Sequence, residues 1–150
     1  MSSRTDKAKA YFLEGYTCSQ AVLMAFADDL GLDQSVAAKI SCGFGGGMGG
    51  MRNVCGAVTG MFMVANLKYG FAAPDSQEEK TNHYALIRKL AEEFEAKHQT
   101  LVCKELLAAL PGKLSQNPSV RDDEYYIVRP CALYVEDAVK ILEAAMEAAE

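Results

Sequence analysis

The chain has 150 residues, 50% of them hydrophobic and 23% charged, which is enough to form one hydrophobic core without disulfides or metals. With 15 basic and 20 acidic residues the net charge is −5, which argues against nucleic-acid binding through a basic face. The amino end lacks the apolar segment of a signal peptide, and the most hydrophobic stretch, 53–67, is too short to span a bilayer. We therefore expect a single domain over residues 1–150, located in the cytoplasm and without membrane insertion.

The first third of the chain carries three helix signals. Thr5, Thr17 and Asp33 are residue types that cap helix N-termini, because their side-chain oxygens accept backbone N–H groups. The helices expected after them cover about 5–14, 18–30 and 34–40. In the second helix the apolar side chains repeat with the 3.6-residue period. A glycine-rich loop follows, with six glycines between residues 41 and 50.

Helical patterns also dominate the rest of the chain. Ser76 and Glu79 fit a capping box at the start of a long helix to about residue 98. Further helices are expected over about 55–69, 103–110 and 131–149. The segment 111–130 contains three prolines and is expected to be a long irregular loop, with a brief extended segment at 125–128. Because no stretch alternates long enough for a sheet, the predicted fold is all-α: one compact bundle of about six or seven helices, a glycine-rich loop and one long irregular loop.

The five cysteines are the most informative residues. An odd number disfavours a secreted disulfide framework and favours free or metal-bound thiols in a reducing compartment. Four of them fall in the first turns of predicted helices: Cys18, Cys55, Cys103 and Cys131. The N–H groups and dipole of a helix start stabilise a thiolate by about 0.3–1 kcal/mol, and a nearby cation strengthens the effect. Cys42, at the head of the glycine loop, has no such helix start.

Basic residues lie beside three of these cysteines in the sequence: Arg52, Lys104 and Arg129. We therefore expect lowered pKa values at the four helix starts. Such thiols can exchange disulfides, bind zinc or an iron–sulfur cluster, or act as a nucleophile beside a base, for which His98 is a candidate next to Cys103. Since the chain has no Cys-x-x-Cys, tertiary structure would have to assemble any cluster. The plain alternative is a helical scaffold or interaction protein with inert, buried cysteines.

The pattern of these residues is recognisable. The chain has a lone cysteine in Tyr16-Thr-Cys-Ser-Gln, then Cys55-Gly-Ala-Val-Thr-Gly, and then lone Cys103 and Cys131. This pattern resembles the C_GCAxxG_C_C family. That family consists of small prokaryotic proteins described as redox-active, with four signature cysteines and a CGAxxG motif. The resemblance runs from about Cys18 to the last helix and gives Cys42 no counterpart. It places the signature on Cys18, Cys55, Gly56, Ala57, Gly60, Cys103 and Cys131.

The glycine loop contains a literal G-x-G-x-x-G at 45–50. A dinucleotide site would need a strand before it, a helix directly after it and an acidic residue about 20 positions later. We expect instead a loop with positive φ angles, whose backbone N–H groups approach Cys55 or a bound anion. The candidate binding residues are Gly45, Gly46, Gly47 and Gly56. In the helix that follows Cys55, Gly56 and Gly60 are expected to let a neighbouring helix pack on the turn that bears the thiol.

The leading hypothesis is a thiol redox protein in which Cys18, Cys55, Cys103 and Cys131 are the catalytic residues. Cys103 and Cys131 are the preferred pair, because the segment between them is expected to be mobile. The alternative is a non-enzymatic module in which the same four cysteines bind zinc or an iron–sulfur cluster. The redox partner, whether a protein or a small molecule, is left open. The apolar glycine-rich segment is also compatible with a homo-oligomer.

Overall fold

The structure of the protein is a computed structural model that describes residues 3–110 and 112–149. Its elements are α1 (Ser3–Leu13), α2 (Cys18–Ala27), α3 (Gln34–Ser41), the 3-10 turn η1 (Cys42–Phe44), α4 (Gly45–Met48), α5 (Gly56–Tyr69), α6 (Gln77–His98), α7 (Cys103–Leu106), α8 (Asp123–Val128) and α9 (Cys131–Ala148). The all-α prediction is confirmed, since over these two ranges an isolated bridge between Val54 and Val102 is the only β pairing. No helix in the same ranges is both long and apolar enough to cross a membrane.

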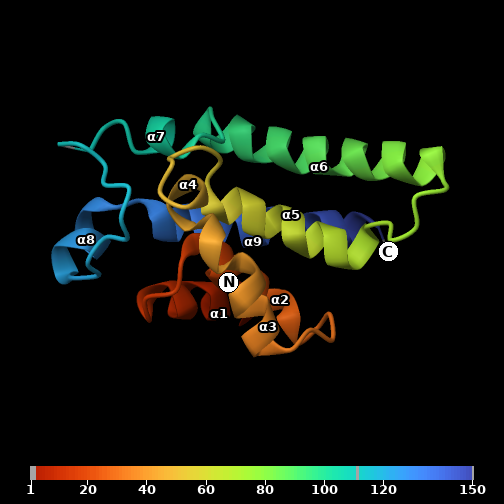
Figure 1. Ribbon diagram of the computed structural model, residues 1–150, viewed down its shortest axis with the longest axis horizontal. Helices are drawn as coiled ribbons and strands as arrows, with labels where there is room; N and C mark the ends of the chain where they lie inside the picture. Colours follow the sequence, from red (N-terminus) through yellow and green to blue (C-terminus); the bar gives the residue numbers. More distant parts are fainter. Residues whose placement is uncertain (1–2, 111, 150) are drawn as a thin grey trace.

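The helices pack in layers around α5. This helix contacts α2, α6 and α9, while α1 packs against α2 and α9. Figure 1 shows α6 along one side of the molecule, α1 to α3 along the other, and α5 and α9 between them. Three of the largest fully buried side chains come from three different helices, α1, α2 and α6: Phe12, Phe26 and Phe94. Both α5 and α9 begin at the end of the molecule that carries α7 and α8 (Figure 1).

Three of the four predicted helix caps are confirmed. Thr17 forms a complete capping box with Gln20, in which each side chain bonds the backbone N–H of the other residue. Asp33 and Ser76 each accept the N–H group three residues further on. The expectation that Thr5 caps the first helix is wrong. Thr5 is a fully buried residue inside α1, which begins ahead of it.

The extended segment predicted at 125–128 is also wrong, because these residues belong to α8. The Asp122 carboxylate caps this helix by accepting the N–H of Tyr125 at 2.8 Å. The ring of Phe12 on α1 then lies 6.3 Å from the ring of Tyr125 and 6.0 Å from that of Tyr126. Aromatic and β-branched side chains favour a strand locally. Here the cap and the ring contacts with α1 override that preference and shorten the predicted irregular loop.

Candidate functional site

Four helices begin around one cavity, and each brings a cysteine to it. Cys18, Cys103 and Cys131 are the first residues of α2, α7 and α9, and Cys55 is the N-cap of α5. All four line a cavity of about 310 Å³. The predicted placement at helix starts is therefore confirmed. Cys42 lines the same cavity but is exposed, whereas Cys55, Cys103 and Cys131 are buried.

Two of these helix starts are joined through the backbone. The N–H of Cys55 donates to the Leu101 carbonyl at 2.8 Å, and the N–H of Cys103 donates to the Asn53 carbonyl at 2.6 Å. These bonds flank the isolated bridge and bring the starts of α5 and α7 side by side. The sequence reasoning missed this link. A signal for it existed, since both cysteines directly follow a valine, a β-branched residue that favours extended backbone.

Two glycines of α5 let that helix lie directly on the first turn of α2. A Cβ atom added at Gly56 would lie 3.2 Å from the Cβ of Cys18. One added at Gly60 would lie 2.9 Å from the Ser19 carbonyl oxygen, closer than real Cβ atoms approach backbone. The prediction that these glycines allow a neighbouring helix to pack on the turn that bears Cys55 is confirmed. The neighbouring helix is α2, whose first residue is Cys18.

The glycine loop forms one wall of the cavity. Gly47 has φ +67°, and a Cβ added there would lie 2.6 Å from the Cβ of Cys103 and 2.6 Å from the Cα of Arg52. Only glycine fits this position without rearrangement. The loop follows the helical elements α3 and η1 instead of a strand, so the context of a dinucleotide site is absent from this part of the described chain. The four candidate glycines all line the cavity: Gly45, Gly46, Gly47 and Gly56.

A family sequence model described as "Putative redox-active protein (C_GCAxxG_C_C)" matches residues 16–145. The chain belongs to this family. The matched range contains the four helix-start cysteines and the Cys55–Gly60 motif. No curated protein sequence and no solved structure is detectably similar to the chain. Membership in the C_GCAxxG_C_C family thus indicates redox activity, and the chemistry has to be argued from the site.

Cys131 differs from the other signature cysteines in its acidity. Its pKa is lowered from the ordinary value of 9.0 to about 7, chiefly by a hydrogen bond from the Cys18 thiol. Burial opposes this shift, while the positive charges of Arg129 and Arg121 and a hydrogen bond from Arg129 support it. About half of Cys131 is therefore thiolate at neutral pH, which is the form that reacts with disulfides.

For the other three signature cysteines the prediction of a lowered pKa is wrong. The hydrogen bond to Cys131, together with burial, raises the pKa of Cys18 well above 9.0. Burial raises the pKa of Cys55 to about 12, although the nearby backbone N–H groups of Ala57 and Val58 in α5 act to lower it. Burial also raises the pKa of Cys103, against the opposing charge and hydrogen bond of Arg52. A helix start alone therefore does not make these thiols acidic.

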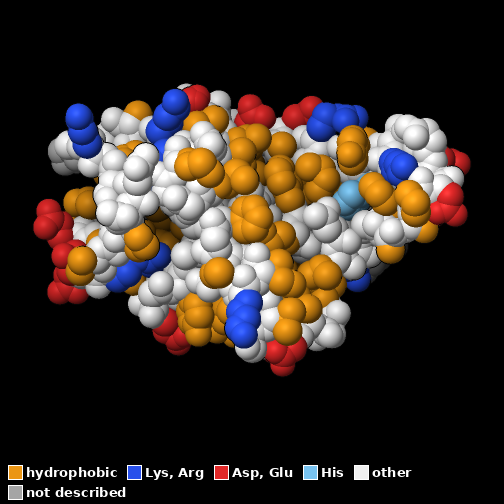
Figure 2. Space-filling view, viewed as in Figure 1, with side chains coloured by type: hydrophobic (Ala, Val, Ile, Leu, Met, Phe, Trp, Pro, Cys, Tyr) orange, Lys and Arg blue, Asp and Glu red, His pale blue; other side chains and the backbone are white. Residues whose placement is uncertain are grey.

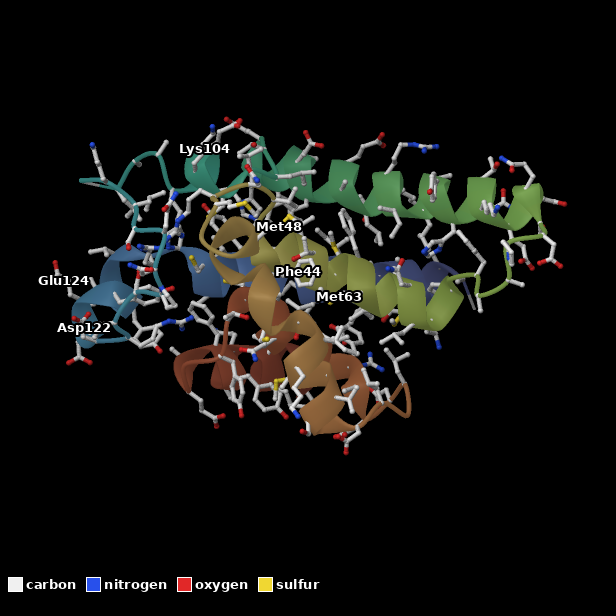
Figure 3. The ribbon with its side chains drawn as sticks, in the orientation of Figure 1. Phe44, Met48, Met63, Lys104, Asp122 and Glu124 are labelled. Atoms are coloured by element: carbon white, nitrogen blue, oxygen red, sulfur yellow. The ribbon has the colours of Figure 1, made fainter. Side chains whose placement is uncertain are left out.

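The cations near the thiols are only partly those expected from the sequence. Arg129 does act on Cys131. Arg52 contacts Cys103 instead of its sequence neighbour Cys55, with its Nη1 at 3.7 Å from the Cys103 Sγ. Lys104 is exposed on the outer side of α7 and does not line the cavity (Figure 3). These differences arise because the pairing of Val54 with Val102, and not proximity in the sequence, determines which side chains lie near each other.

Arg121 is a cation of the site that the sequence reasoning missed. Its guanidinium donates to the carbonyl oxygens of Phe12 and Tyr16, each at 3.1 Å. It also lies over the rings of Phe12 and Tyr125, at 4.5 and 4.7 Å from their centroids. Residue 121 sits in a loop, and its partners on α1 and beyond are more than 100 positions away in the chain. No local pattern could have revealed this contact.

His98 is not the base of a cysteine–histidine pair. Its Nε2 lies 2.7 Å from the Asp137 Oδ2, which links the end of α6 to α9. The polar partner of the Cys103 sulfur is instead the Arg52 guanidinium. Within residues 3–110 and 112–149, no three His, Cys, Asp or Glu side chains form a group that could hold a metal ion. The metal-ligand alternative remains a prediction.

Proposed function

We propose that this protein is a thiol–disulfide redox protein in which Cys131 is the attacking thiolate and Cys18 the resolving thiol. The observation that carries the proposal is the contact of these two cysteines in a cavity lined by all four signature thiols. Two sulfurs of opposite protonation state lie together, one stabilised as a thiolate and the other held as its hydrogen-bond donor. This is the arrangement that a two-step exchange needs.

In the first step the Cys131 thiolate attacks one sulfur of a substrate disulfide. A bond forms between the Cys131 Sγ and that sulfur, while the substrate S–S bond breaks. The second substrate sulfur leaves as a thiolate and takes a proton from solvent. The product is a mixed disulfide between Cys131 and the substrate, and no second protein thiol has been oxidised at this stage.

The second step follows from the loss of charge at Cys131. The pKa of Cys18 is raised chiefly because its thiol donates to the Cys131 thiolate, and Coulomb repulsion adds to the effect. Both causes disappear once Cys131 is in a mixed disulfide, so the Cys18 thiol becomes more acidic at that moment. Its thiolate then attacks the Cys131 sulfur and releases the remaining substrate thiol. Overall the substrate disulfide is reduced and two protein thiols become one disulfide.

This assignment revises the preferred pair. From the sequence we favoured Cys103 as the partner of Cys131. In the structure the Cys18 thiol is the hydrogen-bond partner of Cys131, whereas the interaction of Cys131 with Cys103 is the charge of Cys131 raising the pKa of Cys103. All five cysteines are free in this state, so the disulfide requires the first turns of α2 and α9 to move closer together.

Mass mapping of the protein after treatment with one equivalent of glutathione disulfide tests the proposal. We expect the loss of two hydrogens and a Cys18–Cys131 cross-link. The Cys18→Ser variant should accumulate a glutathione adduct on Cys131, because no thiol resolves it. The Cys55→Ser variant is the matched control and should still form the cross-link.

Oxidation of the remaining thiols of Cys131→Ser by glutathione disulfide at the wild-type rate, through any other cysteine pair, would sink the assignment of the attacking residue. Native mass spectrometry of protein purified without oxygen provides a second check. A mass increased by zinc, or by iron and sulfide, would favour the alternative in which the four cysteines are ligands.

A further inference from the structure

The charge of the thiol cavity is opposite to that of the chain. Three arginines line it, whereas no Asp or Glu is found among its described lining residues. The protein as a whole carries −5. The acidic side chains of α8 lie outside the cavity: Figure 3 shows Asp122 and Glu124 at the outer edge of this helix, and Figure 2 shows acidic groups along the same edge of the molecule. The three arginines are Arg52, Arg121 and Arg129.

The positive charge of these arginines is not neutralised by carboxylates. The guanidinium of Arg121 is held by two carbonyl oxygens and by aromatic rings, all of them uncharged. Arg129 donates to the Ser119 hydroxyl at 3.4 Å and lies 5.0 Å from the centre of the Tyr125 ring. In the described parts of the chain, none of the cavity arginines forms an ion pair with Asp or Glu. One thiolate at Cys131 therefore leaves the cavity with a net positive charge.

Among the described residues that line the cavity, Arg52 is the arginine with a buried donor that has no hydrogen-bond partner. Its Nη2 donates to the Ser115 carbonyl at 2.6 Å, and its Nη1 makes a long contact of 3.7 Å with the Cys103 sulfur. Its Nε is buried and has no partner. A buried donor without a partner has lost its bonds to water without replacement, so an acceptor bound at the guanidinium would relieve an existing penalty. Gly46 leaves one side of the guanidinium uncovered, since a Cβ there would point at Nη1 from 3.9 Å.

We infer that the natural substrate of the proposed exchange is a small disulfide that carries a carboxylate or similar anionic group, bound by Arg52 while Cys131 attacks the sulfur. The inference rests on the proposed function and adds the chemical class of its substrate. A cavity of about 310 Å³ has the size of a small-molecule site. A guanidinium recognises a carboxylate through paired N–H bonds, which a neutral disulfide cannot use.

Three simple disulfides of different charge test the inference. The reduced protein is mixed with dithiodipropionate (anionic), hydroxyethyl disulfide (neutral) or cystamine (cationic), and the oxidation rate of Cys131 is measured. Each rate is divided by the rate of the same disulfide with free mercaptoethanol, which removes differences in intrinsic reactivity. We expect the normalised rates to fall in the order anionic, neutral, cationic, with about tenfold or more between the extremes. The preference should shrink at high salt, because mobile ions screen the attraction.

Variants of Arg52 separate binding from structural effects. Arg52→Gln should lower the ratio of the anionic to the neutral normalised rate at least severalfold, because it removes the charge that recognises the carboxylate, and this charge is not among the causes of the Cys131 pKa shift. Arg52→Lys should recover part of the anionic rate. Lys104→Gln is the control, since it removes an equal charge nearby from an exposed side chain outside the cavity.

The outcomes distinguish this inference from the proposed function. Equal normalised rates, or cystamine as the fastest, would overturn the anionic substrate and leave thiol exchange intact. An equal slowing of all three disulfides in Arg52→Gln would overturn the binding role of Arg52. If no disulfide oxidises Cys131, the proposed function itself fails.

Discussion

The starts of α9 and α5 place a cysteine in nearly the same local setting, yet the two thiols differ by about five pKa units. Cys131 begins α9 and has a pKa of about 7, whereas Cys55 caps α5 and has a pKa of about 12. Both are buried, and two backbone N–H groups of α5 act to lower the pKa of Cys55. Cys131 has in addition a thiol donor and two arginines.

The difference shows what a helix start can and cannot do for a thiol. The dipole contributes about 0.3–1 kcal/mol, which is less than the roughly 1.4 kcal/mol of one pKa unit. Removal of a thiolate from water costs more than that at a buried site. A helix start therefore yields a reactive thiol only where cations and donors from other elements reach it. In this protein those groups come from α2 and from the chain between α7 and α9.

Alkylation of the reduced protein with iodoacetamide across pH gives the largest expected contrast between the two helix starts. The rate at Cys131 should rise with pH around a midpoint of about 7, because the thiolate is the reacting form. Cys55 should react far more slowly than Cys131 at every pH at which the protein stays folded, because burial raises its pKa to about 12. Peptide mapping assigns each rate. Midpoints near the ordinary thiol value at both positions would contradict the assigned difference.

Removal of one arginine should raise the pKa of Cys131 towards that of Cys55. Arg129→Gln deletes a positive charge and a donor, so the pKa of Cys131 should rise towards 9.0 and its alkylation at pH 7 should slow. A complete return would reduce the thiolate from about half to about one in a hundred molecules, so the slowing is at most about fiftyfold. Arg129→Lys should retain part of the effect. Arg88→Gln, on the exposed face of α6, should leave the profile unchanged.

A more moderate effect is expected where α5 lies on α2. Gly60→Ala should destabilise the protein by about 1–2 kcal/mol, because the overpacking against the Ser19 carbonyl and the Val22 side chain exceeds the gain in helix propensity. Urea unfolding measures the change. Gly43→Ala is the matched control, since its Cβ meets nothing within 4 Å and the change should stay within about 0.5 kcal/mol. A stabilised Gly60→Ala protein would show that α5 is free to move away from α2.

The smallest effect concerns the fifth cysteine. Cys42 lines the cavity but is exposed, and it is not among the groups that shift the pKa of Cys131. Cys42→Ser should change neither the cross-link map nor the rate with dithiodipropionate by more than about twofold. Loss of the Cys18–Cys131 cross-link in this variant would instead make Cys42 part of the exchange.

The features that were predictable from the sequence are local ones. Thr17 and Asp33 cap their helices through contacts three residues away, and the Gly56 and Gly60 spacing is a property of one helix face. The acidity of the thiols was not predictable in this way. It depends on Arg121 and on the Cys18–Cys131 contact, which join segments more than 100 residues apart.

The same limit explains the error at α8. Its aromatic residues favour a strand when they are considered alone, and they become helical because Asp122 caps them and Phe12 packs on them. The link between Cys55 and Cys103 is an intermediate case. A repeated Val-Cys pair hinted at extended backbone, but it did not indicate that the two segments pair with each other.

The unpaired arginines of the cavity also couple oxidation to anion binding. In the reduced protein the Cys131 thiolate partly balances their charge, whereas in a disulfide Cys131 carries none. The oxidised form should therefore hold an anion more tightly than the reduced form. Linkage requires the converse: a small anion that occupies the cavity would shift the thiol–disulfide equilibrium towards the oxidised protein by the ratio of its affinities for the two forms. In the proposed exchange, the redox state of the protein would therefore depend on the concentration of small anions around it.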